Sequence, residues 1–251
     1  MTMDSSDNSR KEKWKDGTDY DRYIQEELTS FRKKAWKEQI CKNFDGRKKL
    51  HILDVGTGPG FLSCILSEEG HLLTGIDASE GMLACAEKNA EKMGVHPRFL
   101  HMDIDHMEFA DESFDVIVSR NVTWTLEHPE SVYREFYRIL KKNGILLIYD
   151  ANWHRHFFDE ELYRKVREHE KECLLKYGRE EVVAEPDYDL FETAPLTKEI
   201  RPQWDIRFLQ DELSMSVKVE QDIGSRLYEQ WEKELYRESP LFEICAVKQE
   251  K

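Results

Sequence analysis

The chain has 251 residues and a formal net charge of −14, from 51 acidic and 37 basic residues. Because an acidic surface repels phosphate backbones, we expect no nucleic-acid partner. The five cysteines are odd in number and show no C-x-x-C spacing, which favours reduced thiols in a cytoplasmic protein and predicts neither a disulfide framework nor a metal site.

Residues 1–46 are predicted to form a disordered N-terminus followed by a capping helix. The opening MTMDSSDNSRKEKWKDG is polar, lacks the hydrophobic region of a secretory signal, and is expected to be disordered over its first dozen residues. An apolar stripe from Tyr20 to Cys41 predicts one helix or two short ones. No later stretch approaches the roughly 18 apolar residues of a membrane span, so we expect no membrane partner.

From residue 47 onward, short apolar runs alternate with helical segments. The expected helices run from the glycine-rich loop to about Glu69, from an N-cap at Ser79 to Met93, and from Pro129 to Lys142. Such alternation predicts a mostly parallel sheet that is covered by helices on both faces. The expected strands are Lys49–Val55, His71–Asp77, Pro97–Ile104, Phe114–Ser119 and Ile145–Asp150.

This rhythm breaks after Asp150, and we expect a helical insertion at about residues 152–213. Ligands of open α/β sheets bind outside the carboxyl ends of the strands, so the N-terminal helix and the insertion are predicted to act as a lid there. After the insertion, two strands flank a helix. The segments are a charged helix (Asn152–Tyr177), a loop (Arg179–Pro202), a short helix (Trp204–Leu213), and then Ser216–Ile223, Ser225–Arg237 and Leu241–Lys248.

The stretch HILDVGTGPGFLS places three glycines, Gly56, Gly58 and Gly60, between the first strand and its helix. The dinucleotide fingerprint needs a third glycine where this chain has Phe61. A phosphate loop needs a lysine and a hydroxyl residue after its last glycine, and here Phe61 and Leu62 follow. The loop therefore matches neither nucleotide-binding pattern.

Three carboxylates stand at the ends of successive strands. Asp54 precedes the glycine loop, where it disfavours a pyrophosphate and suits a ligand with a positively charged end. Asp77 can accept both hydroxyls of a ribose, and Asp103 can accept from the amine of a purine. Each aspartate alone is common as a turn or cap residue. Together they predict a nucleoside ligand with a cationic tail.

Three segments resemble class I S-adenosylmethionine-dependent methyltransferases of the broad small-molecule group. They are LDVGTGPGFLS, TGIDASEGML and the block from Phe109 to Asp150, and the likeness covers about Leu50 to Asp150. The resemblance implies a Rossmann-like, seven-stranded, mostly parallel sheet with an antiparallel C-terminal strand, and a methyltransferase domain over residues 47–251. It also implies S-adenosyl-L-methionine as cofactor and S-adenosyl-L-homocysteine as product.

The resemblance also implies roles for individual residues. Asp54 and Gly56 would hold the methionine amino group directly or through water, and Asp77 would bind the ribose. Arg120 and Asn121 would lie beside the methionine moiety. A tyrosine of the N-terminal helix would cover the cofactor, although plain helix packing is an equal alternative for it. The full implied set is Tyr20, Tyr23, Asp54, Gly56, Thr57, Gly58, Asp77, Ala78, Met82, Asp103, Ile104, Arg120 and Asn121.

The acceptor is expected to be a small molecule. The fourth strand ends in Ser-Arg-Asn-Val (residues 119–122), not in the N/D-P-P-Y/F pattern of enzymes that methylate amide or base nitrogens. The stretch Asn121–Thr125 is predicted to line the methionine end of the cofactor and the substrate entrance. Trp124, Asn152 and Trp153 are predicted to line the substrate side, although Trp124 could equally be a core residue. His154 or His156 could take a proton from the acceptor, the alternative being two surface residues at a helix start. Methyl transfer is an in-line displacement that often needs no strong base.

The leading hypothesis is thus an enzyme that transfers methyl groups to a small molecule, as a monomer or homodimer. One alternative is a cofactor-binding regulatory protein of the same fold without transfer activity. Another is an aminopropyl transferase, for which the acidic run EPDYDLFE (residues 185–192) could hold a polyamine. The acceptor atom, whether O, N, S or C, does not follow from the sequence.

Overall fold

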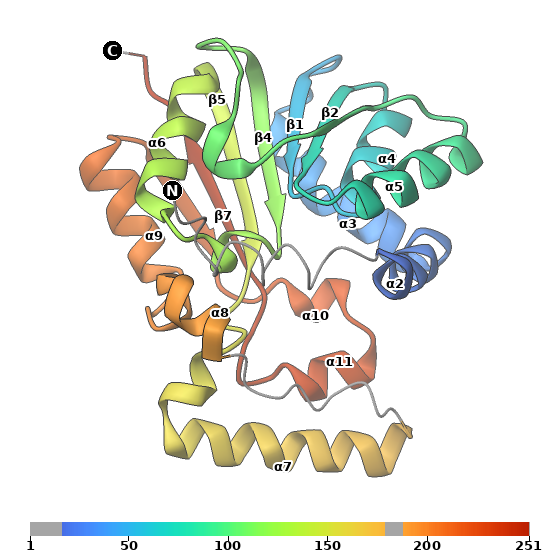
Figure 1. The fold of residues 1–251 in the computed structure, drawn as a ribbon, viewed down its shortest axis with the longest axis vertical. Coiled ribbons are helices and arrows are strands. Elements are labelled where there is room, and N and C mark those ends of the chain that lie inside the picture. Colours follow the sequence, from blue (N-terminus) through green and yellow to red (C-terminus); the bar gives the residue numbers. More distant parts are fainter. Residues whose placement is uncertain (1–16, 179–187, 251) are drawn as a thin grey trace, which may run out of the picture.

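Seven strands form one sheet in the computed structural model, which describes residues 17–178 and 188–250. Their order is β3-β2-β1-β4-β5-β7-β6; the strands from β3 to β5 run parallel, and β7 runs antiparallel to β5 and β6. This topology confirms the expected fold (Figure 1). The strands are β1 (His51–Val55), β2 (Leu72–Asp77), β3 (Arg98–His101), β4 (Phe114–Arg120), β5 (Leu140–Asp150), β6 (Ser216–Glu220) and β7 (Phe242–Val247).

Helices cover both faces of this sheet (Figure 1). Short 3-10 turns join several of them, among which η3 (Thr123–Thr125) follows β4 directly. The α-helices are α2 (Thr18–Thr29), α3 (Phe31–Cys41), α4 (Phe61–Glu68), α5 (Glu80–Met93), α6 (Pro129–Ile139), α7 (Glu160–Tyr177), α8 (Tyr188–Thr193), α9 (Gln203–Arg207), α10 (Gly224–Leu227) and α11 (Gln230–Leu235).

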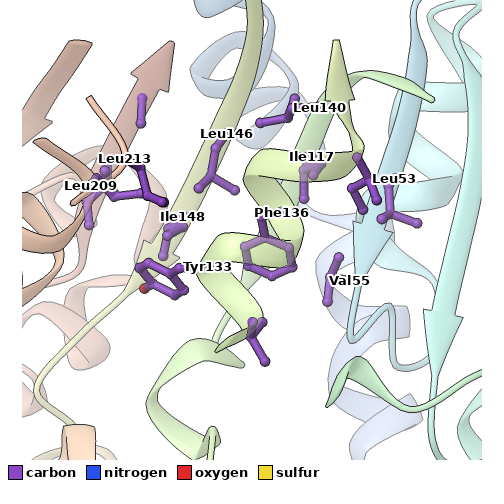
Figure 2. Packing of buried hydrophobic residues seen from close by; sticks show 14 of the residues in the cluster. Leu53, Val55, Ile117, Tyr133, Phe136, Leu140, Leu146, Ile148, Leu209 and Leu213 are labelled. Atoms are coloured by element: carbon purple, nitrogen blue, oxygen red, sulfur yellow. The ribbon is translucent and has the colours of Figure 1, made fainter. Parts of the chain in front are cut away.

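Each face of the sheet has its own hydrophobic core. On one face, Tyr133 and Phe136 of α6 pack with strand residues such as Ile117 and Ile148 (Figure 2). On the other face, helices α3, α4 and α10 pack on the same strands, and the indole of α3 Trp36 meets the ring of β5 Tyr149 edge-on at 5.1 Å. Because the central strands are buried on both faces, their apolar runs could be recognised in the sequence.

Of the two forms predicted for the N-terminal segment, one helix or two short ones, the structure shows two helices, because the chain bends at Ser30. Ser30 has extended backbone angles and its hydroxyl accepts from the backbone N–H of Arg32, so it ends α2 and caps α3. The predicted disorder over the first dozen residues lies outside the described part of the chain.

Several predicted boundaries were wrong. The charged helix expected over Asn152–Tyr177 begins only at Glu160, and the expected loop Arg179–Pro202 contains α8 and the turn η5. Helix α6 ends at Ile139, not at Lys142, because Leu140 already pairs with Phe114 in the sheet and strand β5 begins there. The predicted single helix Ser225–Arg237 is two short helices, α10 and α11. The predicted cap at Ser79 is confirmed, since its hydroxyl accepts from the N–H of Met82 at 3.1 Å.

The chain between β5 and β6 is helical where it is described. It contains α7, α8 and α9 with the turns η4 (Arg155–Phe158) and η5 (Pro195–Thr197) and a π-helical turn η6 (Phe208–Glu212). Helix α7 lies at the far end from the sheet, beside α11 (Figure 1). Lys176 of α7 and Glu234 of α11 form an ion pair at 2.9 Å. The lid role and the bounds of the insertion remain predictions.

Candidate functional site

A pocket opens at the carboxyl ends of β1, β2 and β4. Helix α2 closes one side through Tyr20, and the segment after β3 contributes another wall. The pocket therefore lies where open α/β sheets hold their ligands. Its lining residues are Tyr20, Gly56, Gly58, Ile76, Asp77, Ala78, Ser79, Met82, Met102, Asp103, Ile104, Arg120, Asn121, Val122 and Thr125.

Most of the residues implied as cofactor ligands line this pocket. The exceptions are Tyr23, Asp54 and Thr57. Three lining residues were not anticipated, namely Ile76, Ser79 and Met102. They adjoin predicted site residues closely enough that adjacency was an available signal. Val122 and Thr125, from the stretch expected to line the methionine end, reach the pocket through the turn after β4.

The glycine loop packs directly against that turn. Gly56 has φ +66°, and a Cβ added there would lie 2.4 Å from Cγ2 of Val122. No side chain fits at such a distance, so position 56 requires glycine for space as well as for conformation. The loop and the turn after β4 are thereby held as one wall of the pocket.

Asp54 supports the loop from behind. Its Oδ2 accepts hydrogen bonds from the Thr57 hydroxyl at 2.6 Å, from the Ser63 hydroxyl at 2.8 Å and from the Ser63 N–H at 3.0 Å. Burial raises the pKa of Asp54 to about 6 in spite of these bonds. The carboxylate and Thr57 thus shape the loop. Neither residue lines the pocket itself.

Asp77 stands at the end of β2 in the pocket wall. Its Oδ2 accepts from the Gly58 N–H and its Oδ1 from the Ser79 N–H, both at 2.9 Å, and burial raises its pKa. These bonds orient the carboxylate while each oxygen keeps further acceptor capacity. Asp103 lines the pocket too, and its Oδ1 accepts from the Asp105 N–H at 3.0 Å.

Arg120, at the end of β4, joins the pocket to a buried ionic cluster. Its Nη2 donates to Oε1 of Glu27 at 2.8 Å. Arg32 pairs with Glu27 at 3.5 Å and with Glu232 of α11 at 3.2 Å, and the Tyr23 hydroxyl donates to Glu232 at 2.9 Å. We call these five residues the Arg120 cluster. Tyr23 therefore belongs to this cluster and not to the pocket wall.

Several buried polar atoms beside the pocket have no hydrogen-bond partner among the described residues. They include Nε of Arg120 and Oδ1 of Asn121, both in lining residues, and Oε2 of Glu27. The Arg120 guanidinium lies over the rings of Trp36 and Phe61, at 4.6 and 4.9 Å from the two ring centroids. The three unpartnered atoms are shielded from solvent, so Arg120 and Asn121 line the pocket through their other atoms.

The three residues predicted for the substrate side do not line the pocket. Trp124 is almost fully buried. The Asn152 amide donates to the Arg201 carbonyl at 2.8 Å and accepts from its N–H at 3.0 Å. The Trp153 indole donates to Oδ1 of Asp150 at 3.0 Å. Their contacts tie the end of β5 to the insertion, which explains why they sit away from the pocket.

His154 and His156 also lie outside the pocket lining. His154 packs against Trp124 at 4.6 Å and against Phe191 at 5.2 Å between ring centroids. His156 is buried, and burial lowers its pKa to about 4, so it is neutral near pH 7. Both rings act as packing residues of the insertion in this structure, and a base with such a low pKa is a weak proton acceptor.

Over 17–178 and 188–250, no group of three or more His, Cys, Asp or Glu side chains is placed to hold a metal ion. Within the same ranges, no helix has the length and apolar character required to cross a membrane.

A known protein family matches the part of the chain that forms most of the pocket. Residues 53–148 match the family model described as methyltransferase domain. This match assigns a methyltransferase domain to residues 53–148. The matched segment runs from β1 to β5, so the methyltransferase domain holds the glycine loop, Asp77 and Arg120 within its recognised core.

The chain matches curated methyltransferases over about half of their length. The chain is 37% identical over 99 residues to a phosphatidylethanolamine N-methyltransferase of Cereibacter sphaeroides, covering 39% of this chain and 48% of that protein. It is 30% identical over 118 residues to a ubiquinone biosynthesis O-methyltransferase of Rickettsia felis, covering 46% and 47%. The chain therefore spans about half the length of these relatives.

Solved structures share the fold of the methyltransferase domain at low identity. A SAM-dependent methyltransferase from Aquifex aeolicus is 18% identical with a TM-score of 0.56, covering 91% of this chain and 98% of that one. The plantazolicin methyltransferase BpumL, solved with SAH and a substrate analogue, is 18% identical with a TM-score of 0.58, covering 91% and 89%. These likenesses show the arrangement of strands and helices.

Proposed function

We propose that this chain binds S-adenosylmethionine in the pocket and transfers its methyl group to a small-molecule acceptor. One observation carries the proposal. The loop after β1 brings Gly56 and Gly58 to one pocket, and the ends of β2 and β4 and the segment after β3 each add a polar residue of the implied cofactor set there. Their chemistry matches the two ends of this cofactor in turn.

The amino-acid end fits Arg120 and Asn121. Both residues line the pocket, where a guanidinium group suits a carboxylate and an amide side chain can hydrogen-bond to the amino-acid end. Arg120 keeps its charge in this buried position: burial opposes ionisation, but Glu27 outweighs that effect and raises the pKa of Arg120. Both residues would therefore orient the methionine moiety against the turn after β4.

The adenosyl end fits the opposite side of the pocket. Asp77 retains acceptor capacity for two ribose hydroxyls, and the apolar side chains of Ala78, Met82 and Ile104 flank the space beyond it. Asp103 stands there as an acceptor for an exocyclic amine. This order of groups would fix the direction in which the cofactor lies.

The bound cofactor supplies a methyl carbon on a positively charged sulfur, which an acceptor atom displaces in line. The chain has then to align the two reactants and exclude water. Among the described lining residues, the carboxylates are Asp77 and Asp103 and no histidine is present. A small acceptor is supported by the net charge of −14, by the sequence after β4, and by relatives named for phosphatidylethanolamine and ubiquinone biosynthesis. A cytoplasmic location and a monomer or homodimer remain part of this proposal.

Calorimetry with two ligands tests the cofactor assignment. S-adenosylhomocysteine carries the amino-acid end, and 5′-methylthioadenosine lacks it. Arg120→Met should weaken the binding of S-adenosylhomocysteine by about 1.5–3 kcal/mol and leave the binding of 5′-methylthioadenosine unchanged, because only the first ligand has a carboxylate. Asp77→Ala should weaken both. Arg134→Met, at an exposed arginine of α6, is the matched control. Binding of neither ligand to the wild type below about millimolar would refute the assignment.

A second experiment tests transfer. A metabolite extract is incubated with the protein and methyl-labelled S-adenosylmethionine, and labelled products are identified by mass spectrometry. A labelled small molecule is expected. Cofactor binding without label would favour the regulatory alternative. Tighter binding of decarboxylated S-adenosylmethionine than of S-adenosylmethionine would favour the aminopropyl alternative, since an aminopropyl donor lacks the carboxylate that Arg120 is proposed to bind.

A further inference from the structure

A second buried ionic cluster lies behind the turn that forms one wall of the pocket. Arg201, from the insertion, donates through Nη1 to Asp150 at 2.7 Å and through Nε to Asp205 at 2.9 Å. Its Nη2 donates to the Thr123 hydroxyl at 2.7 Å. The Tyr133 hydroxyl donates to Asp205 at 2.5 Å. We call these five residues the Arg201 cluster.

The Arg201 cluster is sealed from solvent and saturated with hydrogen bonds. Arg201 is 2% exposed, and Asp150 and Asp205 are fully buried. The remaining oxygen of Asp150 accepts from the N–H of Ala151 and from the Trp153 indole. Every guanidinium nitrogen of Arg201 thus has an acceptor and both carboxylates are met by donors, which is the condition under which buried charges are tolerated.

The cluster holds the turn η3 from two directions. Oδ2 of Asp150 accepts from both the Thr123 hydroxyl at 2.7 Å and the Trp124 N–H at 3.0 Å. The residues on either side, Val122 and Thr125, line the pocket. Val122 is also the side chain against which Gly56 of the glycine loop packs. The position of the pocket wall therefore depends on where Asp150 and Arg201 hold Thr123.

Arg201 is itself fixed by the insertion to which it belongs. Its backbone exchanges two hydrogen bonds with Asn152, which lies 49 residues earlier at the start of the insertion. The two ends of this long segment are thus clasped beside the end of β5. The same arginine therefore both docks the insertion and holds the residue that positions the pocket wall.

We propose that Arg201 and Thr123 are positioning residues of the methyl-transfer site, which couple the docked insertion to the pocket wall at Val122 and Thr125. The inference rests on the proposed function, because the pocket is taken to hold the cofactor there. Neither residue lines the pocket, so neither touches the reacting atoms. Their effect would be exerted through alignment, to which methyl transfer is sensitive.

The test compares three variants. Thr123→Val removes the hydroxyl shared by Arg201 and Asp150 but keeps the shape of the side chain. Thr123→Ser restores that hydroxyl. Thr197→Val is the matched control, since the Thr197 hydroxyl is also buried in the insertion but donates only to the Ala194 carbonyl. Two quantities are measured: the dissociation constant of S-adenosylhomocysteine, and amide hydrogen exchange of residues 121–126 with and without that ligand.

Thr123→Val should raise the dissociation constant of S-adenosylhomocysteine about three- to tenfold, because coupling through residues that do not touch the ligand is typically of this size. It should also speed exchange at 121–126 in the ligand-free protein. Thr123→Ser should return both quantities towards the wild type, and Thr197→Val should change neither. Unchanged exchange at 121–126 in Thr123→Val, or an equal effect of Thr197→Val, would overturn the inference.

The outcomes separate this inference from the proposed function. If the wild type does not bind S-adenosylhomocysteine, the cofactor assignment fails, yet exchange in the ligand-free protein still shows whether Thr123 holds the turn. If the wild type binds and Thr123→Val binds equally well, the assignment stands and the positioning role is refuted.

Discussion

Two buried ionic clusters flank the same pocket, and they differ in whether their arginine is saturated. In the Arg201 cluster every guanidinium nitrogen donates to a described residue, and the cluster stays behind the pocket wall. In the Arg120 cluster the arginine lines the pocket, and its Nε has no hydrogen-bond partner among the described residues. A saturated buried arginine positions its neighbours, whereas an arginine that lines a pocket can also meet a ligand.

Their charge balance differs as well. The Arg120 cluster pairs two arginines with two glutamates, so it is formally neutral. The Arg201 cluster sets one arginine against two aspartates. Burial disfavours the charge on Arg201, but Asp205 and Asp150 outweigh that effect and raise its pKa well above the ordinary value. Loss of a cation should therefore be most costly in the Arg201 cluster.

The largest expected effect comes from Arg201→Met. The substitution leaves Asp150 and Asp205 buried without their cation, so the free energy of unfolding should fall by about 3–5 kcal/mol. Urea denaturation followed by circular dichroism measures it. Arg134→Met, at a half-exposed ion pair, is the control and should change stability by less than about 1 kcal/mol. Equal losses in the two variants would contradict the assigned importance of the cluster.

Asp54 extends the comparison. Unlike Asp150, it is a buried carboxylate that forms no ion pair with a described residue. Burial raises its pKa from 3.8 to about 6, so the folded protein holds a proton that the unfolded chain releases. Its contribution to stability therefore falls as pH rises from about 4 to about 6, by about 3 kcal/mol, and stays constant above that range.

Asp54→Asn removes this titration. The unfolding free energy of the variant, minus that of the wild type, should rise with pH between about 4 and 6. Asp115→Asn is the opposite control. Although burial opposes it, bonds from the His51 N–H and Lys141 lower the Asp115 pKa, so its contribution is present above the unfolded pKa and lost as pH falls. A flat difference for Asp54→Asn would show that Asp54 does not titrate in this way.

Glu27→Gln should cost less than Arg201→Met. The amide oxygen can still accept from Arg120 and Arg32, and Arg32 retains Glu232. The two charged hydrogen bonds to Glu27 are weakened, so a loss of about 1.5–3 kcal/mol is expected in urea denaturation. Glu26→Gln on the exposed side of α2 serves as control and should have little effect. A loss as large as that of Arg201→Met would remove the distinction drawn between the clusters.

The smallest effect is expected at a surface pair. Lys34 and Glu38 lie 3.6 Å apart on α3, with side chains 82% and 68% exposed. Solvent and salt screen such a pair, so Lys34→Ala should lower the free energy of unfolding by less than about 0.5 kcal/mol. A loss above about 1 kcal/mol would mean that burial is not what separates the strong pairs of this protein from the weak ones.

The predictions from sequence succeeded best between β1 and β5. The runs VIV and ILLI are buried on both sides of the sheet, and Ser79 and Gly94 cap α5 through local bonds. These features depend on neighbours in sequence, so a single sequence can show them. The helix end at Lys142 was wrong because Leu140 is held in the sheet by Phe114, and a pairing partner 26 residues away has no local signal.

The same division holds for the site. Asp77 and Gly58 could be placed because each sits at a strand end that the pattern had located, and parallel strands bring such ends together. Asp54 also stands at a strand end, but its carboxylate turns towards Ser63. Trp153 and His156 were expected near the acceptor; the packing of the insertion, which shows no sequence repeat or motif, carries them away from the pocket.

By itself, then, the sequence determined the succession of strands and helices along the chain and the edge of the sheet at which the pocket opens. It did so because strand period, caps and glycine turns are local properties. Only the tertiary structure decided that Arg201 reaches Thr123 and that Arg120 meets Glu27, 78 and 93 residues apart in sequence. Buried ion pairs form where burial removes water and folding supplies the partner, and neither condition can be seen in one segment alone.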